Sequence, residues 1–105
     1  MTDVTWLPII YREFYDIPRV FLVDYRGGSF FFDCPFDDSL DDYPDIFIVY
    51  RLPNNLRDQV ESLSWTDLSN SLEKIGFVSV DKVEFDVTKR GFVADRIFEY
   101  IAQVE

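Results

Sequence analysis

The spacing of hydrophobic and polar positions changes near residue 53, which predicts a strand-rich first half and a second half that contains helices. The first half has four apolar or aromatic runs separated by turn-forming residues, a pattern typical of strands. These runs cover residues 9–15, 20–23, 29–34 and 46–50. The sequence therefore predicts a meander of four antiparallel strands.

A glycine pair predicts the turn between the second and third strands. Gly27 and Gly28 lie between two apolar runs, and glycine tolerates the positive φ that both central positions of a tight hairpin turn require. With these two residues at the centre of the turn, Tyr25 should lie opposite Phe30.

Helical spacing replaces this pattern in the second half. Four apolar side chains recur every three or four residues, as on one face of a helix: Trp65, Leu68, Leu72 and Ile75. Ser64 suits the N-cap of this helix, and Gly76 suits its left-handed end. The remaining expected elements are a short helix over 55–62, a fifth strand over 83–87 and a final helix that reaches about Val104.

The expected fold class is α+β, with a mainly antiparallel five-stranded sheet on which two or three helices pack. The chain order is a four-strand meander followed by helix, strand and helix. The alternative is a mixed sheet whose fifth strand lies parallel to the fourth. At 105 residues, we expect residues 1–105 to form a single domain.

Two of the expected strands are apolar on both faces, so both faces of the sheet need cover. These strands are residues 20–23 and 46–50. Two or three helices can cover one face and part of the other. The remaining cover could come from loops, from the first strand or from a second copy of the chain, and a homodimer is therefore one possible arrangement.

The charge balance limits the kinds of partner. Twenty acidic and ten basic residues give a net charge of −10, without a basic stripe. Nucleic acids and anionic membranes attract basic surfaces, so neither is expected to bind directly. A basic protein or a metal cation remains. The chain also lacks the basic and apolar segments of a signal peptide and any apolar run of membrane-spanning length, so we expect a cytoplasmic protein.

Aspartates are concentrated in one short stretch that contains no Lys or Arg. Six of them occur between residues 33 and 45: Asp33, Asp37, Asp38, Asp41, Asp42 and Asp45. Such a run should stay in water and project a negative field. Phe36 and Tyr43 flank its centre, and aromatic side chains beside carboxylates suit the capture of Arg and Lys. The candidate partner-binding residues are Phe36, Asp37, Asp38, Asp41, Asp42, Tyr43 and Asp45.

Conventional catalytic groups are missing from the sequence. Histidine is absent and Cys34 is the only cysteine, which removes the usual Ser-His and Cys-His nucleophiles and the usual transition-metal sites. Paired carboxylates could still act as acid and base, but hydrated aspartates stay ionised and do not differ in pKa as such a pair must. We therefore expect a non-catalytic protein without a cofactor.

Three functional hypotheses follow from these patterns. The leading one is a small acidic binding protein that engages a basic protein partner. Its acidic, aromatic-rich and histidine-free character is similar to that of bacterial immunity proteins and DNA mimics, which neutralise basic nucleases, although the chain carries no family motif. The second is a Ca²⁺ site in the 33–45 loop, which lacks the glycine and final glutamate of an EF-hand. The third is a homodimeric domain of unknown role.

Overall fold

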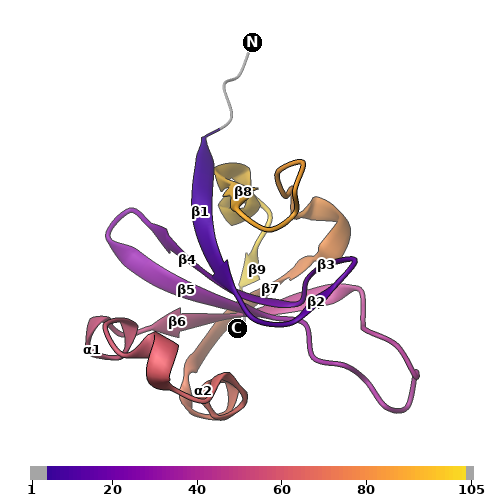
Figure 1. Ribbon diagram of the computed structural model, residues 1–105, viewed down its shortest axis with the longest axis horizontal. Helices are drawn as coiled ribbons and strands as arrows, with labels where there is room; N and C mark the ends of the chain where they lie inside the picture. The colour runs from indigo at the N-terminus through magenta and orange to yellow at the C-terminus, as the bar shows by residue number, and fades with distance from the viewer. Residues whose placement is uncertain (1–4, 104–105) are drawn as a thin grey trace.

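The computed structural model describes residues 5–103, which form an antiparallel sheet of seven strands and a separate two-stranded ribbon (Figure 1). Across the sheet the strands follow the order β8 (Phe92–Ala94), β1 (Trp6–Tyr11), β4 (Val20–Tyr25), β5 (Gly28–Asp33), β6 (Ile46–Leu52), β7 (Glu73–Ser79) and β9 (Ala102–Gln103). The ribbon pairs β2 (Phe14–Tyr15) with β3 (Ile17–Pro18).

Short helices occupy the connections. Between β6 and β7 lie α1 (Asn54–Arg57), the 3₁₀ helix η1 (Val60–Ser62) and α2 (Trp65–Ser71). Two further 3₁₀ helices flank β8, namely η2 (Val80–Lys82) and η3 (Asp95–Glu99).

The predicted class, a sheet-plus-helix domain with an antiparallel sheet, is confirmed. The predicted meander is present as β1, β4, β5 and β6, each antiparallel to the next. The five-strand count is wrong, because β7, β8 and β9 extend the sheet at its two edges. The alternative with a parallel fifth strand is also wrong, since every pairing among the described strands is antiparallel.

Alternation along the central strands produces two hydrophobic cores, one on each face of the sheet. On the first face lie Phe21, Val23, Phe32, Phe47, Val49 and Val78. On the second lie Val20, Leu22, Phe31, Tyr50 and Leu52. The apolar character of both faces, which the sequence showed, thus reflects a sheet that is covered on both sides.

The chain itself covers both faces (Figure 1). Val60, Trp65 and Leu68, from the α1–α2 segment, complete the second core. The C-terminal segment passes over the first core, to which it contributes Val93 and Ile97. This segment pairs with β1 through β8 and with β7 through β9, so it reaches both edges of the sheet. A second copy of the chain is therefore not required as cover.

The predicted helix over 64–76 is too long. Ser64 is the N-cap as expected, but α2 ends at Ser71, and residues 73–79 form β7 instead. Pairing of β7 with β6 buries Val78. The stabilisation from this long-range pairing outweighs the local preference for a helix that the spacing indicates. Gly76 is consequently a strand residue and not a helix end.

The predicted strand over 83–87 and the predicted final helix are both wrong. Residues 83–87 contribute only an isolated bridge between Phe85 and Val93. Residues 92–94 pair with β1 as β8, and the helical part of the segment is limited to η3. The spacing of apolar residues such as Val93 and Ile97, four positions apart, suggested the final helix, and both side chains are buried. Val104 lies outside the described residues.

The hairpin between β4 and β5 forms one residue earlier than predicted. Arg26 and Gly27 have φ values of 50° and 81°, so Tyr25 pairs with Gly28, and Phe30 pairs with Val23. In the observed register, polar side chains contact one another across the hairpin. Rules based on the turn residues alone take no account of such contacts.

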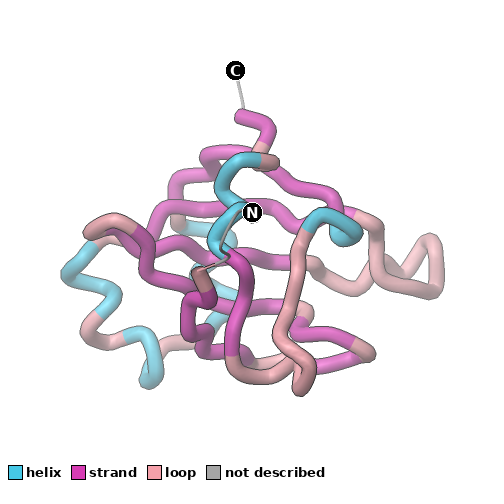
Figure 2. The backbone as a smooth tube through the Cα atoms, turned by 90° about the horizontal axis from the view of Figure 1, so that it is seen from above, coloured by secondary structure: helices cyan, strands magenta, loops and turns pink. Residues whose placement is uncertain are grey.

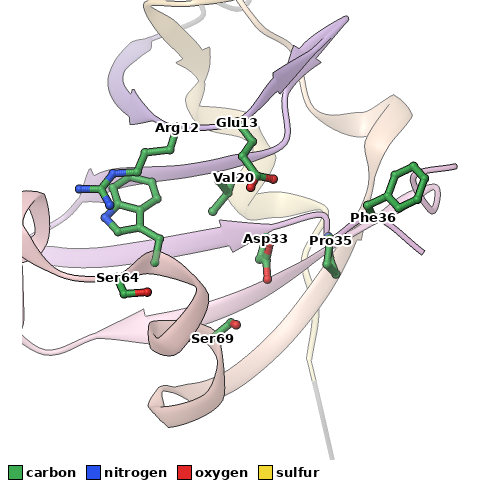
Figure 3. Close-up of a pocket in the computed structure, with 9 residues that line it drawn as sticks. Arg12, Glu13, Val20, Asp33, Pro35, Phe36, Ser64 and Ser69 are labelled. Carbon is green, nitrogen blue, oxygen red and sulfur yellow. The ribbon is translucent and has the colours of Figure 1, made fainter. Parts of the chain in front are cut away.

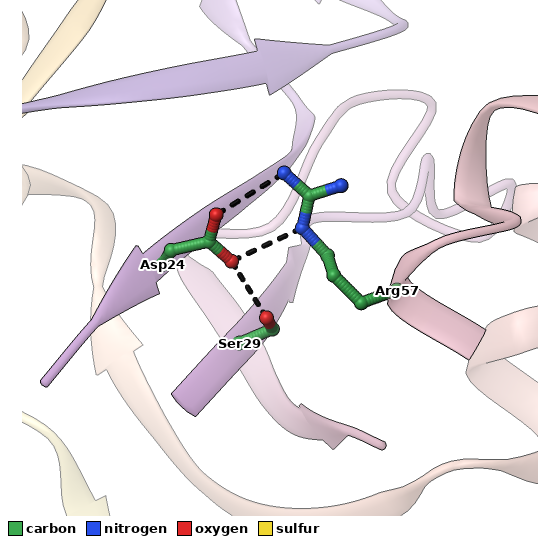
Figure 4. A network of polar contacts seen from close by, with 3 residues as sticks. All are labelled: Asp24, Ser29 and Arg57. Atoms are coloured by element: carbon green, nitrogen blue, oxygen red, sulfur yellow. Dashed lines mark hydrogen bonds and ion pairs between the residues drawn. The ribbon is translucent and has the colours of Figure 1, made fainter. Parts of the chain in front are cut away.

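Those contacts centre on Asp24, which pairs across the hairpin with Ser29 (Figure 4). The Ser29 hydroxyl donates to Asp24 Oδ1 at 2.6 Å. Arg57 of α1 adds two bonds of 3.1 Å to the same carboxylate, and they hold the pKa of Asp24 below its usual range. The network joins α1 to the β4–β5 hairpin.

Candidate functional site

The predicted acidic loop forms a small hairpin that extends beyond the sheet (Figure 1, Figure 2). We call residues 36–43 the acidic hairpin. Its ends are joined by an antiparallel bridge in which the Asp37 amide donates to the Asp42 carbonyl at 2.9 Å. The Asp37 carboxylate accepts bonds from the Ser39 amide and hydroxyl, which hold its pKa below the usual range. The aspartates therefore belong to a turn with a defined shape.

Most of the predicted carboxylates face solvent. Asp38, Asp41, Asp42 and Asp45 are exposed and Asp37 is half-buried. Within residues 5–103, the acidic hairpin makes no ion pair with Lys or Arg. Leu40, near the tip of the hairpin, is 61% exposed. The hairpin thus presents negative charge around one apolar side chain.

Aromatic side chains pack at the base of the acidic hairpin. The Phe36 ring meets the Tyr43 ring edge-on, with centroids 5.3 Å apart. Tyr15 lies 5.5 Å from Tyr43 on another side, and the Arg19 guanidinium lies 4.5 Å from the Tyr43 centroid. Tyr43 is therefore half-buried and supports the hairpin, whereas Phe36 and Tyr15 are 48% and 58% exposed.

A cleft of about 440 Å³ opens beside the acidic hairpin (Figure 3). Its lining comes from the loop after β1, from the neighbouring ends of β4 and β5, from the start of the acidic hairpin and from the start of α2. The lining includes Arg12, Glu13, Val20, Asp33, Phe36 and Trp65. The cleft and the hairpin form one continuous region, because Phe36 belongs to both.

Two carboxylates share this cleft. Asp33 ends β5 on the same face as the second core, beside its cross-strand partner Val20. Burial, and secondarily the negative charge of Glu13, raise the pKa of Asp33 to about 6. Burial, together with the charge of Asp33, also raises the pKa of the Tyr50 hydroxyl. Asp33 forms no ion pair among the described residues.

The nearby arginine is committed to other partners. The Arg12 guanidinium donates to the carbonyls of Leu63 and Glu61, at 2.9 and 2.6 Å, and lies 4.5 Å from the centroid of the Trp65 ring. Arg12 consequently ties the loop after β1 to the segment before α2 and forms one wall of the cleft. It makes no ion pair with Glu13 or Asp33.

This arrangement combines negative charge with apolar walls, which suits a cation that also has hydrocarbon or planar surface. Residues 5–103 contain no group of three or more His, Cys, Asp or Glu side chains placed to hold a metal ion. In the acidic hairpin, the carboxylates of Asp37 and Asp42 accept bonds from Ser39 and from the Tyr43 amide.

Sequence reasoning located the acidic hairpin but missed the cleft. Asp33 was recognised only as one member of the acidic run. It lies two residues after Phe31 in the same strand, however, so its side chain is on the same face of the sheet as that of Phe31. Glu13, Arg12 and Arg19 carry no local signal, since their roles depend on segments distant in the chain. The structure brings Phe36 and Tyr43 together, and it places Asp45 outside the hairpin.

Within the described residues, no helix is both long and apolar enough to cross a bilayer. Comparison with known proteins finds no matching family model and no significantly similar curated protein or solved structure.

Proposed function

We propose that this chain is a non-catalytic binding protein that engages a basic protein partner through the acidic hairpin. The observation that carries the proposal is a projecting hairpin whose exposed carboxylates form no ion pair within the described residues, next to the exposed rings of Phe36 and Tyr15. A more specific form of the proposal is an inhibitor of the immunity or antitoxin type, directed at a basic nuclease or toxin.

The two kinds of side chain would act at different stages of binding. Exposed carboxylates raise the rate of encounter with a basic surface and orient the approaching partner. Aromatic rings that become buried slow dissociation, because they provide contact area with few rotatable bonds. Charge should therefore control association, and Phe36 should control dissociation.

The test compares two variants of equal net charge. In the first, Asp37, Asp38, Asp41 and Asp42 are changed to Asn. In the second, four exposed acids away from the hairpin are neutralised: Asp58→Asn, Asp67→Asn, Asp81→Asn and Glu99→Gln. The partner is a basic protein captured from native lysate, and its binding kinetics are measured by surface plasmon resonance at several salt concentrations.

We expect the hairpin variant to lower the association rate by about tenfold or more at low salt, within the range of electrostatic steering. The difference should shrink as salt rises, because the screening length falls to about 8 Å at physiological ionic strength. The distant variant should have the smaller effect. Equal association rates for wild type and the hairpin variant at low salt would contradict the proposal.

Acid–base catalysis in the cleft is a second candidate, favoured by one observation. Asp33, with its pKa raised to about 6, lies in the same cleft as Glu13, and glycoside hydrolysis uses two carboxyl groups, one of them an acid with a raised pKa. The assay is release of nitrophenol from a panel of nitrophenyl glycosides. Turnover that both Asp33→Asn and Glu13→Gln abolish would support catalysis, whereas turnover no faster than that in buffer would reject it for these substrates.

A further inference from the structure

We propose that the cleft beside the acidic hairpin is a receptor for a guanidinium group, into which one arginine side chain of the basic partner inserts between Glu13 and Asp33. This inference rests on the proposed function, and it specifies the chemistry that the partner must present. The acidic hairpin would attract the partner, and the cleft would select a particular residue on it.

The dimensions of the cleft suit one long side chain. Its volume of about 440 Å³ lies within the roughly 300–1,000 Å³ of small-molecule sites. Figure 3 shows Glu13 reaching toward Asp33 from the opposite wall, with Phe36 at one end of the lining and Arg12 at the other. An extended side chain could thus enter beside Phe36 and place its charged end near both carboxylates.

The charges in the cleft are unbalanced in favour of a cation. Glu13 and Asp33 form no ion pair among the described residues, and the guanidinium of Arg12 is bound to two carbonyls. Half-burial of Asp33 disfavours its ionised form in the free protein. A bound cation would reverse that penalty, because an opposite charge at short range favours the carboxylate.

The walls favour arginine over lysine. Val20 and Phe36 offer surface to an aliphatic stem, and the exposed Phe36 ring can stack on a planar cation. A guanidinium can also donate two parallel bonds to one carboxylate, whereas an ammonium acts as a compact and strongly hydrated point charge. Both properties predict selectivity for the guanidinium.

The first test uses N-butylguanidinium, with n-butylammonium and neutral N-butylurea as controls, each titrated into the whole protein at pH 7.5. Binding is followed by amide and indole chemical shifts. We expect low-millimolar affinity for butylguanidinium, with shifts concentrated at Glu13, Asp33, Phe36 and Trp65. Affinity should be at least fivefold weaker for butylammonium and undetectable for butylurea.

Variants separate the cleft from the general negative charge of the protein. Asp33→Asn should weaken butylguanidinium binding at least tenfold, while Asp45→Asn, which removes an exposed aspartate outside the cleft lining, should change it less than twofold. Equal effects of the two variants, or equal affinity for both cations with shifts spread over the acidic hairpin, would overturn the inference.

The partner then provides the decisive measurement. Asp33→Asn should raise the dissociation rate of the captured basic protein at least tenfold, as expected for loss of a buried charged contact. If butylguanidinium does not bind while the four-Asn hairpin variant still slows association, the cleft inference fails and the proposed function stands. Binding of the probe together with unchanged partner dissociation would also overturn it.

Discussion

At the scale of single residues, Asp33 combines half-burial with a carboxylate that no described Lys or Arg neutralises. Desolvation disfavours the ionised form of a carboxylate, and the nearby charge of Glu13 adds to that effect. The folded state therefore holds this proton more tightly than the unfolded chain does. Ionisation of Asp33 consequently opposes folding.

This difference predicts how Asp33 affects stability as the pH changes. The pKa of Asp33 rises from 3.8 to about 6 on folding, so the folded state binds more protons than the unfolded state between these pH values. The contribution of Asp33 to stability therefore falls as the pH rises from about 4 to about 6. Asp33→Asn should therefore stabilise the protein by about 1 kcal/mol at pH 7.5, a value reduced from the full shift because solvent reaches the group.

Urea denaturation at two pH values provides the measurement. At pH 3.5 Asp33 is largely protonated in the folded state, so the variant and wild type should differ little in free energy of unfolding. Glu84→Gln, which changes an exposed acid that pairs with Arg96, serves as a control and should not be stabilising at pH 7.5. Equal gains from Asp33→Asn at both pH values would disprove the electrostatic explanation.

At the scale of secondary-structure elements, local pattern identified the meander and misassigned β7. Strands β1, β4, β5 and β6 were predictable because consecutive apolar runs separated by turns pair with their neighbours along the chain. The apolar spacing from Trp65 to Ile75 suits a helix, yet Ile75 packs with the first core and Trp65 with the second. Whether the end of this segment forms a helix or a strand is decided by its long-range pairing with β6. The spacing of apolar residues gives no information about that pairing.

The same limit explains why half of the candidate site was predictable. The acidic hairpin is continuous in sequence, so its charge, its flanking rings and its exposure could be anticipated. The cleft is assembled from residues 12, 13, 20, 33, 35, 36, 64, 65 and 69. No spacing rule relates those segments, and their proximity follows from the strand order and from the position of α2.

Gly76 provides a test of the β7–β9 pairing. A Cβ added at Gly76 would lie closer to the backbone oxygen of Ala102 than van der Waals contact allows. Gly76→Ala should therefore displace β9 and lower the free energy of unfolding by about 1–3 kcal/mol. Faster amide hydrogen exchange in β9 should accompany the loss.

Gly27→Ala is the matched control for this substitution. Gly27 has φ of 81° with open space around it, so alanine there should cost about 1–2 kcal/mol through backbone strain alone and leave exchange in β9 unchanged. If Gly76→Ala preserves β9 protection, the close approach of Ala102 is not a feature of the folded protein in solution.

At the scale of the whole molecule, the net charge of −10 means that negative side chains repel one another in the folded protein. The acidic hairpin concentrates part of that charge on one side of the sheet, where its carboxylates form no ion pair with a described Lys or Arg. Screening weakens such repulsion, since it acts between solvent-exposed charges.

We therefore predict that sodium chloride raises the melting temperature of the protein. An increase from about 0.01 M to about 0.15 M shortens the screening length from about 30 Å to about 8 Å, which should stabilise wild type by a few degrees. The four-Asn hairpin variant should begin at a higher melting temperature and gain less from salt. A salt response of equal size in both proteins would show that hairpin repulsion does not affect stability.

The composition of the acidic hairpin also determines which covalent reagent can trap a complex. Residues 27–50 contain six carboxylates and no lysine, so cross-linkers that join two amines have no site on this surface. A carbodiimide instead condenses an aspartate directly with a lysine of the bound protein, leaving an amide without a spacer. Trypsin would release the modified segment as one peptide of residues 27–51, which makes the point of attachment readable by mass spectrometry.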